Sequence, residues 1–170
     1  MTTILITGPI GSGKSLACRY LESKGYPVYD SDSRTKALYD SVPGLKDTLE
    51  HELGIPFHQL YLIFTDPDKK KRLEDIVYPL VAADIAAWKT SLDAPVAIIE
   101  SANALGKPLF ESLYDKVLLI TAPYSERVQR NPKTAGRNSL QSFDESSADW
   151  VVINDGTKQE LFDKIDNIPL

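Results

Sequence analysis

The stretch that decides the fold is TILITGPIGSGKSLACRYLESKG, which runs from Thr3 to Gly25. Its first residues are apolar and β-branched, so they predict a short buried strand over residues 2–7. Three glycines and a lysine follow, and apolar residues at helical spacing then predict a helix over 12–24 that stops at Gly25. A glycine-rich turn between a strand and a helix can present backbone N–H groups and the positive end of the helix dipole to a phosphate.

The turn itself, GPIGSGKS over residues 8–15, fits the pattern G-x-x-x-x-G-K-[ST] of a phosphate-binding loop. Glycines allow positive φ angles, which let successive N–H groups converge on phosphate oxygens. Lys14 can reach the β- and γ-phosphates of a nucleotide, and the hydroxyl of Ser15 can hold Mg²⁺. The competing interpretation is a turn that binds nothing, but the strand before the turn and the helix after it favour the phosphate site.

The rest of the chain alternates apolar strands with helices. Further strands are predicted over 26–32, 94–101, 114–123 and 148–156. Residues 43–90 are predicted to be mostly helical, with Pro79 kinking or dividing a helix, and residues 125–143 read as polar and irregular. This alternation indicates an α/β fold with a parallel five-stranded sheet covered on both faces. In such sheets, ligands bind at the carboxyl ends of the strands.

The composition is that of an ordinary globular domain, because 42% of the 170 residues are hydrophobic and 25% are charged. A net charge of −5 makes nucleic acid a poor candidate partner. Cys18 is the single cysteine, so an intrachain disulfide is excluded; it is expected to be a buried thiol, which suits a cytoplasmic protein. No apolar run approaches the ~20 residues that a membrane span needs, and no signal peptide is recognisable, so we expect no membrane partner.

Acidic residues are predicted at two strand ends. Asp30 and Asp32 end the second strand, and Glu100 ends the third. At a shared sheet edge, Asp30 could face Lys14 and accept a hydroxyl proton, and Glu100 could bind the metal directly or through water. The alternatives are a helix cap, which is equally open for Asp32, and solvent-facing strand ends. This set suits a small-molecule kinase, whereas a GTP-dependent switch is not indicated because the chain has no N-K-x-D tetrapeptide.

Basic residues gather in the polar stretch near the carboxyl-terminal third of the chain. They are Arg127, Arg130, Lys133 and Arg137. A guanidinium group can clamp a phosphate with two hydrogen bonds, so these side chains could close over a nucleotide. A solvated basic loop is the alternative for each of them.

Five segments in order carry a resemblance to a known family. They are ITGPIGSGKS, GYPVYDSD, IFTDPDKKKRLEDIVYP, YDKVLLITAP and SADWVVINDG. Together they resemble the dephospho-coenzyme A kinases, which phosphorylate the ribose 3′-hydroxyl of dephospho-CoA with ATP in the last step of coenzyme A biosynthesis. The phosphate loop alone is generic, but the Asp-x-Asp after the second strand and the Ala-Asp…Asn-x-Gly ending are more specific.

The resemblance implies a fold and a set of roles. The implied fold is a P-loop, nucleoside-kinase-like three-layer sandwich that forms one domain over 1–170, with an inserted helical substrate-binding region over about 35–90 and a lid over about 125–145. Asp30 would activate the acceptor hydroxyl, and Arg130 would lie at the mouth of the lid. Asn154 and Gly156 would lie against adenine. The ATP phosphates would be held by Gly11, Ser12, Gly13, Lys14, Ser15 and Leu16.

The chain also departs from the family pattern. Pro9 and Leu16 replace a usual glycine and a usual hydroxyl residue, and Tyr78 stands where histidine is usual. The segment 54–62 and the lid after Arg130 are shorter than the resemblance implies, so either the chain is a trimmed homologue or mobile segments are missing from it. A kinase for another small alcohol, or a nucleotide-binding regulatory protein without transfer activity, stays open. We expect a small-molecule substrate and a monomer or small homo-oligomer.

Overall fold

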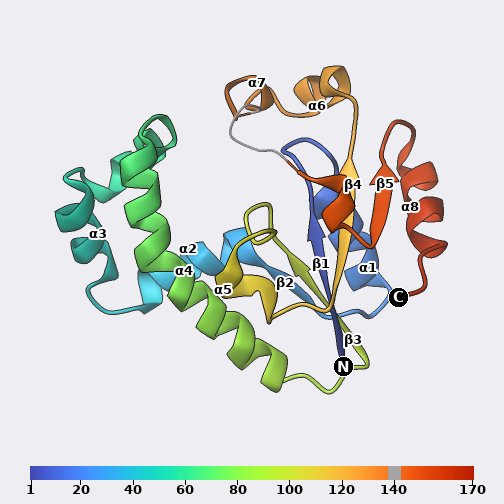
Figure 1. Ribbon diagram of the computed structural model, residues 1–170, viewed down its shortest axis with the longest axis horizontal. Helices are drawn as coiled ribbons and strands as arrows, with labels where there is room; N and C mark the ends of the chain where they lie inside the picture. The colour runs from blue at the N-terminus through green and yellow to red at the C-terminus, as the bar shows by residue number, and fades with distance from the viewer. Residues whose placement is uncertain (138–142) are drawn as a thin grey trace. The chain divides into compact units, whose positions relative to one another are not determined.

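The computed structural model describes residues 1–137 and 143–170, without the side chain of Arg137. The chain divides into two compact units, residues 1–30 together with 91–170, and residues 31–90. Figure 1 labels the α-helices and the strands of both units.

The first unit is built on a sheet of five parallel strands in the order β2-β3-β1-β4-β5. The strands are β1 (Thr2–Thr7), β2 (Val28–Asp30), β3 (Val96–Glu100), β4 (Lys116–Thr121) and β5 (Trp150–Ile153). All are parallel because a helix or a longer crossover returns the chain after each strand. The predicted α/β class with a five-stranded parallel sheet is confirmed.

Helices of the first unit follow its strands. They are α1 (Lys14–Ser23), α5 (Pro108–Glu111), α6 (Tyr124–Arg130), α7 (Thr134–Arg137), the short 3₁₀ helix η3 (Glu145–Ser147) and α8 (Lys158–Asp166). Helices α1 and α8 lie side by side on one face of the sheet, where the ring of Tyr20 stacks on that of Phe162 at a centroid distance of 4.0 Å.

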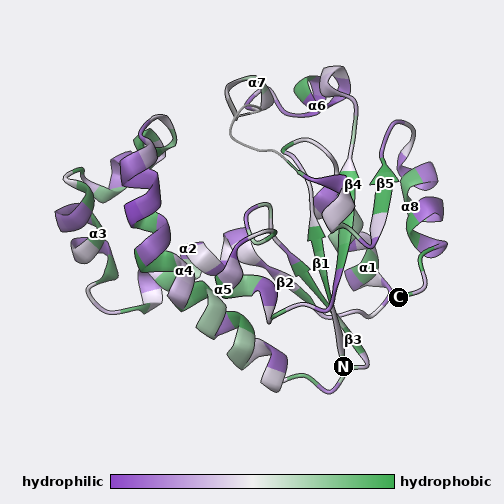
Figure 2. Ribbon diagram, in the orientation of Figure 1, coloured by the Kyte–Doolittle hydropathy of each residue, from purple (hydrophilic) through white to green (hydrophobic). Residues whose placement is uncertain are grey.

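The core of this unit is the apolar sheet and the helix faces packed on it. The strands are hydrophobic along most of their length (Figure 2), as expected for strands buried on both faces. On the face covered by α1 and α8, the buried side chains come from four strands and both helices: Ile4, Ile6, Ala17, Cys18, Leu21, Ile98, Leu118, Ile120, Val152, Leu161 and Ile165. Leu5, Ile99 and Leu119 are equally buried on the opposite face.

The second unit is helical. It consists of α2 (Ser31–Ser41), α3 (Leu45–Leu53), the 3₁₀ helix η1 (Phe57–Thr65) and α4 (Pro67–Thr90). The carboxylate of Asp66 accepts hydrogen bonds from the backbone N–H groups of Asp68 and Lys69 at 3.1 and 3.0 Å, so it caps α4. The guanidinium of Arg34 on α2 binds the carboxylate of Asp84 on α4 with two hydrogen bonds, at 2.8 and 2.6 Å.

Two sequence interpretations of the elements are corrected. Pro79 does not divide its helix, because α4 continues through it from Pro67 to Thr90, and the other predicted effect of Pro79, a kink, stays a prediction. Residues 125–143 are not irregular throughout, because Tyr124–Arg130 forms α6 and Thr134–Arg137 forms α7; residues 138–142 lie outside the described residues. Both errors come from reading local composition alone, although polar and Pro-containing segments can be helical when packing or capping supports them.

Candidate active site

The phosphate loop joins β1 to α1 and contains three glycines with positive φ angles. Gly8, Gly11 and Gly13 have φ values of 144°, 78° and 103°. Each also lies where a side chain would collide with another element: a Cβ would overlap the carbonyl oxygen of Ile120 at Gly8, that of Arg127 at Gly11, and the side-chain amide of Asn154 at Gly13. Backbone conformation and close packing therefore both require glycine at these positions.

The inside of the loop is held by its own hydrogen bonds. The carbonyl oxygen of Pro9 accepts from the backbone N–H of Ser12 at 3.1 Å and from Nζ of Lys14 at 3.3 Å. The side chain of Ser12 is buried, so this residue can offer a ligand only its backbone. Among the described residues, no protein acceptor is recorded for the backbone N–H groups of Gly11 and Gly13, which leaves them available to a phosphate.

Helix α1 begins directly after these glycines, at Lys14. Its positive end therefore points at the loop, which favours a bound anion. Leu16, in the first turn, packs against the core and donates its backbone N–H to the carbonyl oxygen of Gly13 at 3.1 Å. Within the predicted phosphate-binding stretch, Ser12 and Leu16 both have backbone N–H groups that are already used inside the protein.

Two of the predicted acids meet at the carboxyl edge of the sheet. Asp30 ends β2 and Glu100 ends β3, and the two are partners in the parallel register. The hydroxyl of Ser15 donates a hydrogen bond of 2.6 Å to Oε1 of Glu100. Asp30, Glu100 and Ser15 are thus brought together, while Asp32 lies in the first turn of α2, in the other unit.

The charges at this edge act on one another. Burial raises the pKa of Glu100, and the negative charge of Asp30 acts in the same direction, whereas the Ser15 hydroxyl and Lys14 oppose the rise. Cys18 lies behind this group on α1 and is buried, as predicted. Burial, reinforced by Glu100, raises the pKa of the Cys18 thiol well above its ordinary value, so Cys18 stays protonated at neutral pH.

Arg127 contacts the phosphate loop, and the sequence did not predict this contact. It is buried on α6, where its Nε donates to the carbonyl oxygen of Ala122 at 3.1 Å and a terminal nitrogen donates to that of Ile10 at 3.4 Å. Its guanidinium also lies over the ring of Tyr124, 5.5 Å from the centroid. The sequence predicts an irregular stretch with four basic residues here, and no local signal distinguishes Arg127, because the Ile10 carbonyl that it contacts lies 117 positions away.

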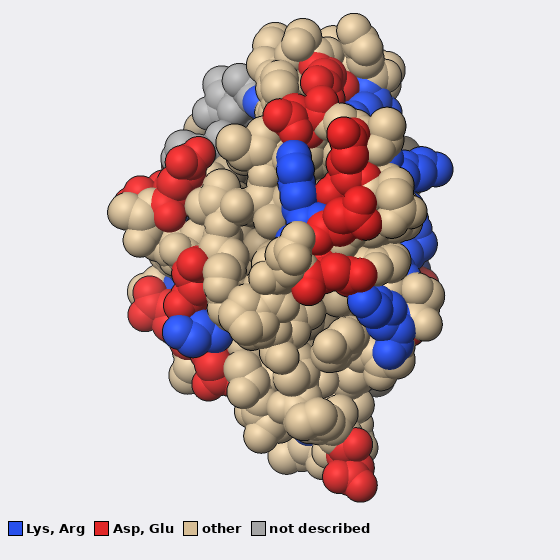
Figure 3. Space-filling model, turned by 90° about the vertical axis from the view of Figure 1, so that its right-hand side faces the viewer, with Lys and Arg blue, Asp and Glu red and all other residues tan. Residues whose placement is uncertain are grey.

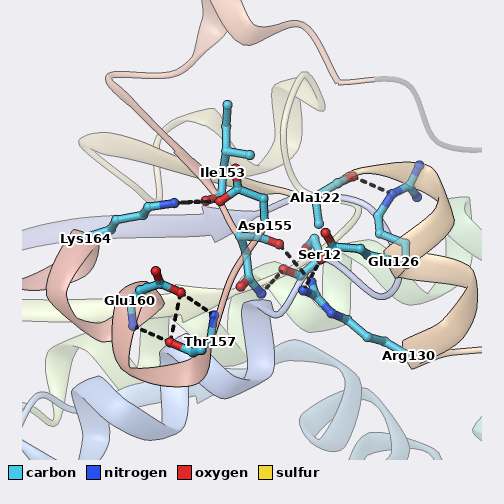
Figure 4. Close-up of polar contacts among 11 residues, drawn as sticks. Ser12, Ala122, Glu126, Arg130, Ile153, Asp155, Thr157, Glu160 and Lys164 are labelled. Atoms are coloured by element: carbon cyan, nitrogen blue, oxygen red, sulfur yellow. Dashed lines mark hydrogen bonds and ion pairs between the residues drawn. The ribbon is translucent and has the colours of Figure 1, made fainter.

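Arg130, one turn further along α6, bridges to the end of β5 (Figure 4). It pairs with the carboxylate of Glu126 at 2.5 Å and donates to the backbone carbonyl oxygen of Asn154 at 3.0 Å. Lys133 follows α6 and donates its backbone N–H to the side chain of Asn131 at 3.0 Å. The side chain of Arg137 lies outside the described part of the chain.

Asn154 contacts the phosphate loop directly. It is 6% exposed, and its side-chain amide donates to the carbonyl oxygen of Ser12 at 2.8 Å. Gly156 follows in the exposed turn before α8, where a Cβ would overlap the carboxylate of Glu160. That carboxylate and Thr157 form a capping box that begins α8.

Charge is mixed on the side of the molecule that carries α8 (Figure 3). Ion pairs on this side include Lys24 with Asp166 at 2.6 Å and Lys164 with Asp155 at 2.8 Å. No helix of the described residues has the length and apolar character that a membrane span requires. Within the same residues, no group of three or more His, Cys, Asp or Glu side chains could hold a metal ion by itself.

Comparison with known proteins decides the family. No family model matches the chain. A curated protein named dephospho-CoA kinase, from Porphyromonas gingivalis, is 34% identical over 175 residues, which take in 91% of this chain and 86% of the relative. The chain belongs to the dephospho-CoA kinase family. The alignment is 175 positions long, which is more than 91% of a 170-residue chain can fill. The alignment with this kinase therefore contains gaps in the present chain.

Solved structures agree with the dephospho-CoA kinase fold. A crystal structure from Thermus thermophilus matches with a TM-score of 0.80 and 30% identity, covering 97% of this chain and 94% of the other. The dephospho-CoA kinase of Campylobacter jejuni matches with a TM-score of 0.64 and 20% identity, over 96% of this chain and 95% of the other, a likeness that shows the fold alone. The sequence-based predictions of family and fold class are confirmed.

Proposed function

We propose that the protein transfers the γ-phosphoryl group of ATP to the ribose 3′-hydroxyl of dephospho-CoA, giving CoA and ADP. Membership of the dephospho-CoA kinase family supports this reaction. The observation that supports it in this chain is that Asp30, Glu100 and Ser15 lie together at the carboxyl edge of the sheet, next to the phosphate loop. A base, a hydroxyl and a polyphosphate cradle side by side are the parts that transfer to an alcohol needs.

In this proposal the backbone of the loop holds the β- and γ-phosphates. The N–H groups of Gly11 and Gly13 have no acceptor among the described residues, so they can donate to phosphate oxygens without losing a bond. Lys14, whose Nζ now donates to Pro9, would swing to the γ-phosphate and offset the negative charge that spreads during transfer. Asp30 would accept or orient the proton of the acceptor hydroxyl.

Mg²⁺ belongs to the proposal because the donor set fits it. Mg²⁺ in kinases uses one or two protein oxygen ligands together with phosphate oxygens and water, so a cluster of three acids is not required. The hydroxyl of Ser15 and the carboxylate of Glu100, 2.6 Å apart, would hold it. When bound, it supplies positive charge against the β- and γ-phosphates.

Arg130 and the segment 125–145 are proposed to close over the nucleotide. Arg130 lies on α6 and contacts the carbonyl of Asn154, so its guanidinium is near the loop in which adenine is expected to lie. Closure would exclude water, which would otherwise compete with the acceptor for the phosphoryl group. Residues 35–90 are proposed to receive the CoA moiety. A cytoplasmic location, and a monomeric or small homo-oligomeric state, complete the proposal.

The deciding experiment is a coupled assay of ADP formation with Mg²⁺ and ATP. We expect turnover with dephospho-CoA, and none above the blank with shikimate, a nucleoside or no acceptor. Lys14→Ala should lower the rate by roughly 10²–10³, by analogy with loss of one preorganised donor, and Lys24→Ala on the opposite end of α1 serves as the matched control. Turnover of another acceptor in preference to dephospho-CoA, or ATP binding without any transfer, would refute the proposed reaction.

A further inference from the structure

Asn154 joins three segments of the first unit at one residue. Its backbone N–H donates to the carbonyl oxygen of Thr121 on β4 at 2.7 Å, and its backbone carbonyl accepts from Arg130 on α6 at 3.0 Å. Its side-chain amide donates to the carbonyl oxygen of Ser12, 142 positions away, at 2.8 Å. All three bonds are made by a residue that is only 6% exposed, so its side chain has one fixed direction.

The bond to Ser12 requires the glycine that follows it. A Cβ at Gly13 would overlap the Nδ2 atom of Asn154, so any larger residue would push the amide away from the Ser12 carbonyl. Gly13 and Asn154 therefore form a matched pair. Gly13 is needed for two reasons. Its φ angle is 103°, and only a residue without a Cβ lets the Asn154 side chain approach from the end of β5.

The bond also fixes a direction inside the loop. In a trans peptide, the C=O of one residue and the N–H of the next point to opposite sides of the chain, and the described chain contains no cis peptide. Holding the Ser12 carbonyl towards Asn154 therefore turns the N–H of Gly13 away from Asn154. That N–H has no acceptor among the described residues.

We propose that Asn154 is a positioning residue for the phosphate loop: by holding the Ser12 carbonyl, it aims the Gly13 N–H at the polyphosphate of the nucleotide. This inference rests on the proposed function, because it assumes that the loop binds ATP. It assigns the Asn154 side-chain amide a target in the phosphate loop, the carbonyl oxygen of Ser12, in addition to the place near adenine that the family resemblance implies for this residue. A donor held in place before the ligand arrives costs no reorganisation when the ligand binds.

The test separates phosphate binding from adenine binding. Affinities of the full chain for inorganic tripolyphosphate and for adenosine are measured by calorimetry, for the wild type and for Asn154→Leu, which keeps the number of side-chain heavy atoms and their branching and removes the donor. We expect tripolyphosphate to bind about tenfold more weakly to the variant, the net value of one hydrogen bond, with adenosine unchanged. In turnover, KM for ATP should rise by a similar factor while KM for dephospho-CoA stays the same.

The matched control is Asn167→Leu. Asn167 follows α8 and donates its side-chain amide to the carbonyl oxygen of Asp163 at 2.9 Å, but it is exposed and does not contact the loop. Its affinities should equal those of the wild type. Unchanged tripolyphosphate binding in Asn154→Leu, or an equal loss for adenosine, would overturn the inference, as would a wild type that does not bind tripolyphosphate.

One further measurement covers the case in which the variant does not fold. If Asn154→Leu does not fold, the wild-type side-chain amide of Asn154 is followed by NMR: protection from exchange and a shift with tripolyphosphate but not with adenosine support the inference, and an unprotected amide overturns it. The binding measurements contain no acceptor. A wild type that binds tripolyphosphate but makes no ADP with dephospho-CoA would therefore refute the proposed function and leave the positioning role standing.

Discussion

Asp30 is the residue on which the proposed chemistry depends most. It ends β2 as the register partner of Glu100, and the carboxylate of Glu100 accepts a hydrogen bond from the hydroxyl of Ser15. Asp30→Asn removes the proton acceptor and leaves the loop backbone untouched, so we expect turnover to fall by about 10²–10⁴ with the affinity for ATP nearly constant. Single-turnover kinetics and ATP calorimetry measure the two quantities.

The control for this substitution is Asp163→Asn, because Asp163 is an exposed acid on α8 whose carboxylate accepts a hydrogen bond from the side chain of Gln159. Asp163→Asn should keep full activity. Normal turnover in Asp30→Asn would remove Asp30 from the mechanism.

Cys18 gives a prediction about pH and stability. Its pKa in the folded state is raised, first by burial and then by Glu100, above the unfolded value of about 8.5. Between these two pKa values the unfolded chain loses a proton that the folded chain keeps, so the stability that Cys18 contributes below pH 8.5 is lost as pH rises. The free energy of unfolding should fall by up to about 1.4 kcal/mol per pH unit from this group alone.

Urea unfolding at several pH values between 7 and 10 measures this effect. Cys18→Ala should lower stability by a constant amount through lost packing, but its stability should decline less steeply above pH 8.5 than that of the wild type. Parallel curves for the two proteins would contradict the assignment.

At the scale of the element, α6 acts on the loop through Arg127. The guanidinium of this buried residue satisfies the carbonyl oxygens of Ala122 and Ile10, and its own backbone lies where Gly11 leaves room. By the same peptide geometry as at Ser12, holding the Ile10 carbonyl turns the N–H of Gly11 the other way. Two neighbouring elements, α6 and the end of β5, thus each fix one peptide of the phosphate loop.

Arg127→Leu should therefore weaken both stability and nucleotide binding. It leaves the carbonyl group of buried Ala122 and that of half-buried Ile10 without this donor, which costs about 1–3 kcal/mol in the free energy of unfolding, and it frees the Gly11 peptide, which weakens ATP binding. Urea unfolding and ATP calorimetry measure these losses. Arg19→Leu, at an exposed position on α1, is the control, and equal results for the two variants would exclude the role of Arg127.

Some features of the site could be predicted from the sequence and others could not. The phosphate loop was predictable because its function needs consecutive residues, and the proximity of Asp30 and Glu100 was predictable because parallel strands end at a common edge. The contacts of Arg127 and Asn154 were not, because each joins residues more than a hundred positions apart and leaves no local pattern. At Pro79 the local rule allowed a kink or a division, and only the division is excluded, because α4 continues through the proline.

At the scale of the whole molecule, the nucleotide loop and its supports all belong to the first unit. The loop, α6 and Asn154 lie within residues 1–30 and 91–170, whereas α3 and its buried residues Leu45, Leu49 and Leu53 lie within 31–90. ATP and the acceptor are therefore expected to act on different parts of the chain, and amide hydrogen exchange can observe each part separately.

We expect Mg²⁺ and ATP, at a hundredfold excess over Kd, to slow the exchange of amides over 8–17 and of Asn154 by up to about 100-fold, because ligand binding adds to the free energy of opening. Amides of α3 should be unaffected by ATP and should become protected only when dephospho-CoA is added. Lys14→Ala at the same ATP concentration is the control and should lose most of the protection over 8–17. Equal protection of α3 and of the loop by ATP alone would contradict this division, because it would mean that nucleotide binding already orders the helices assigned to the acceptor.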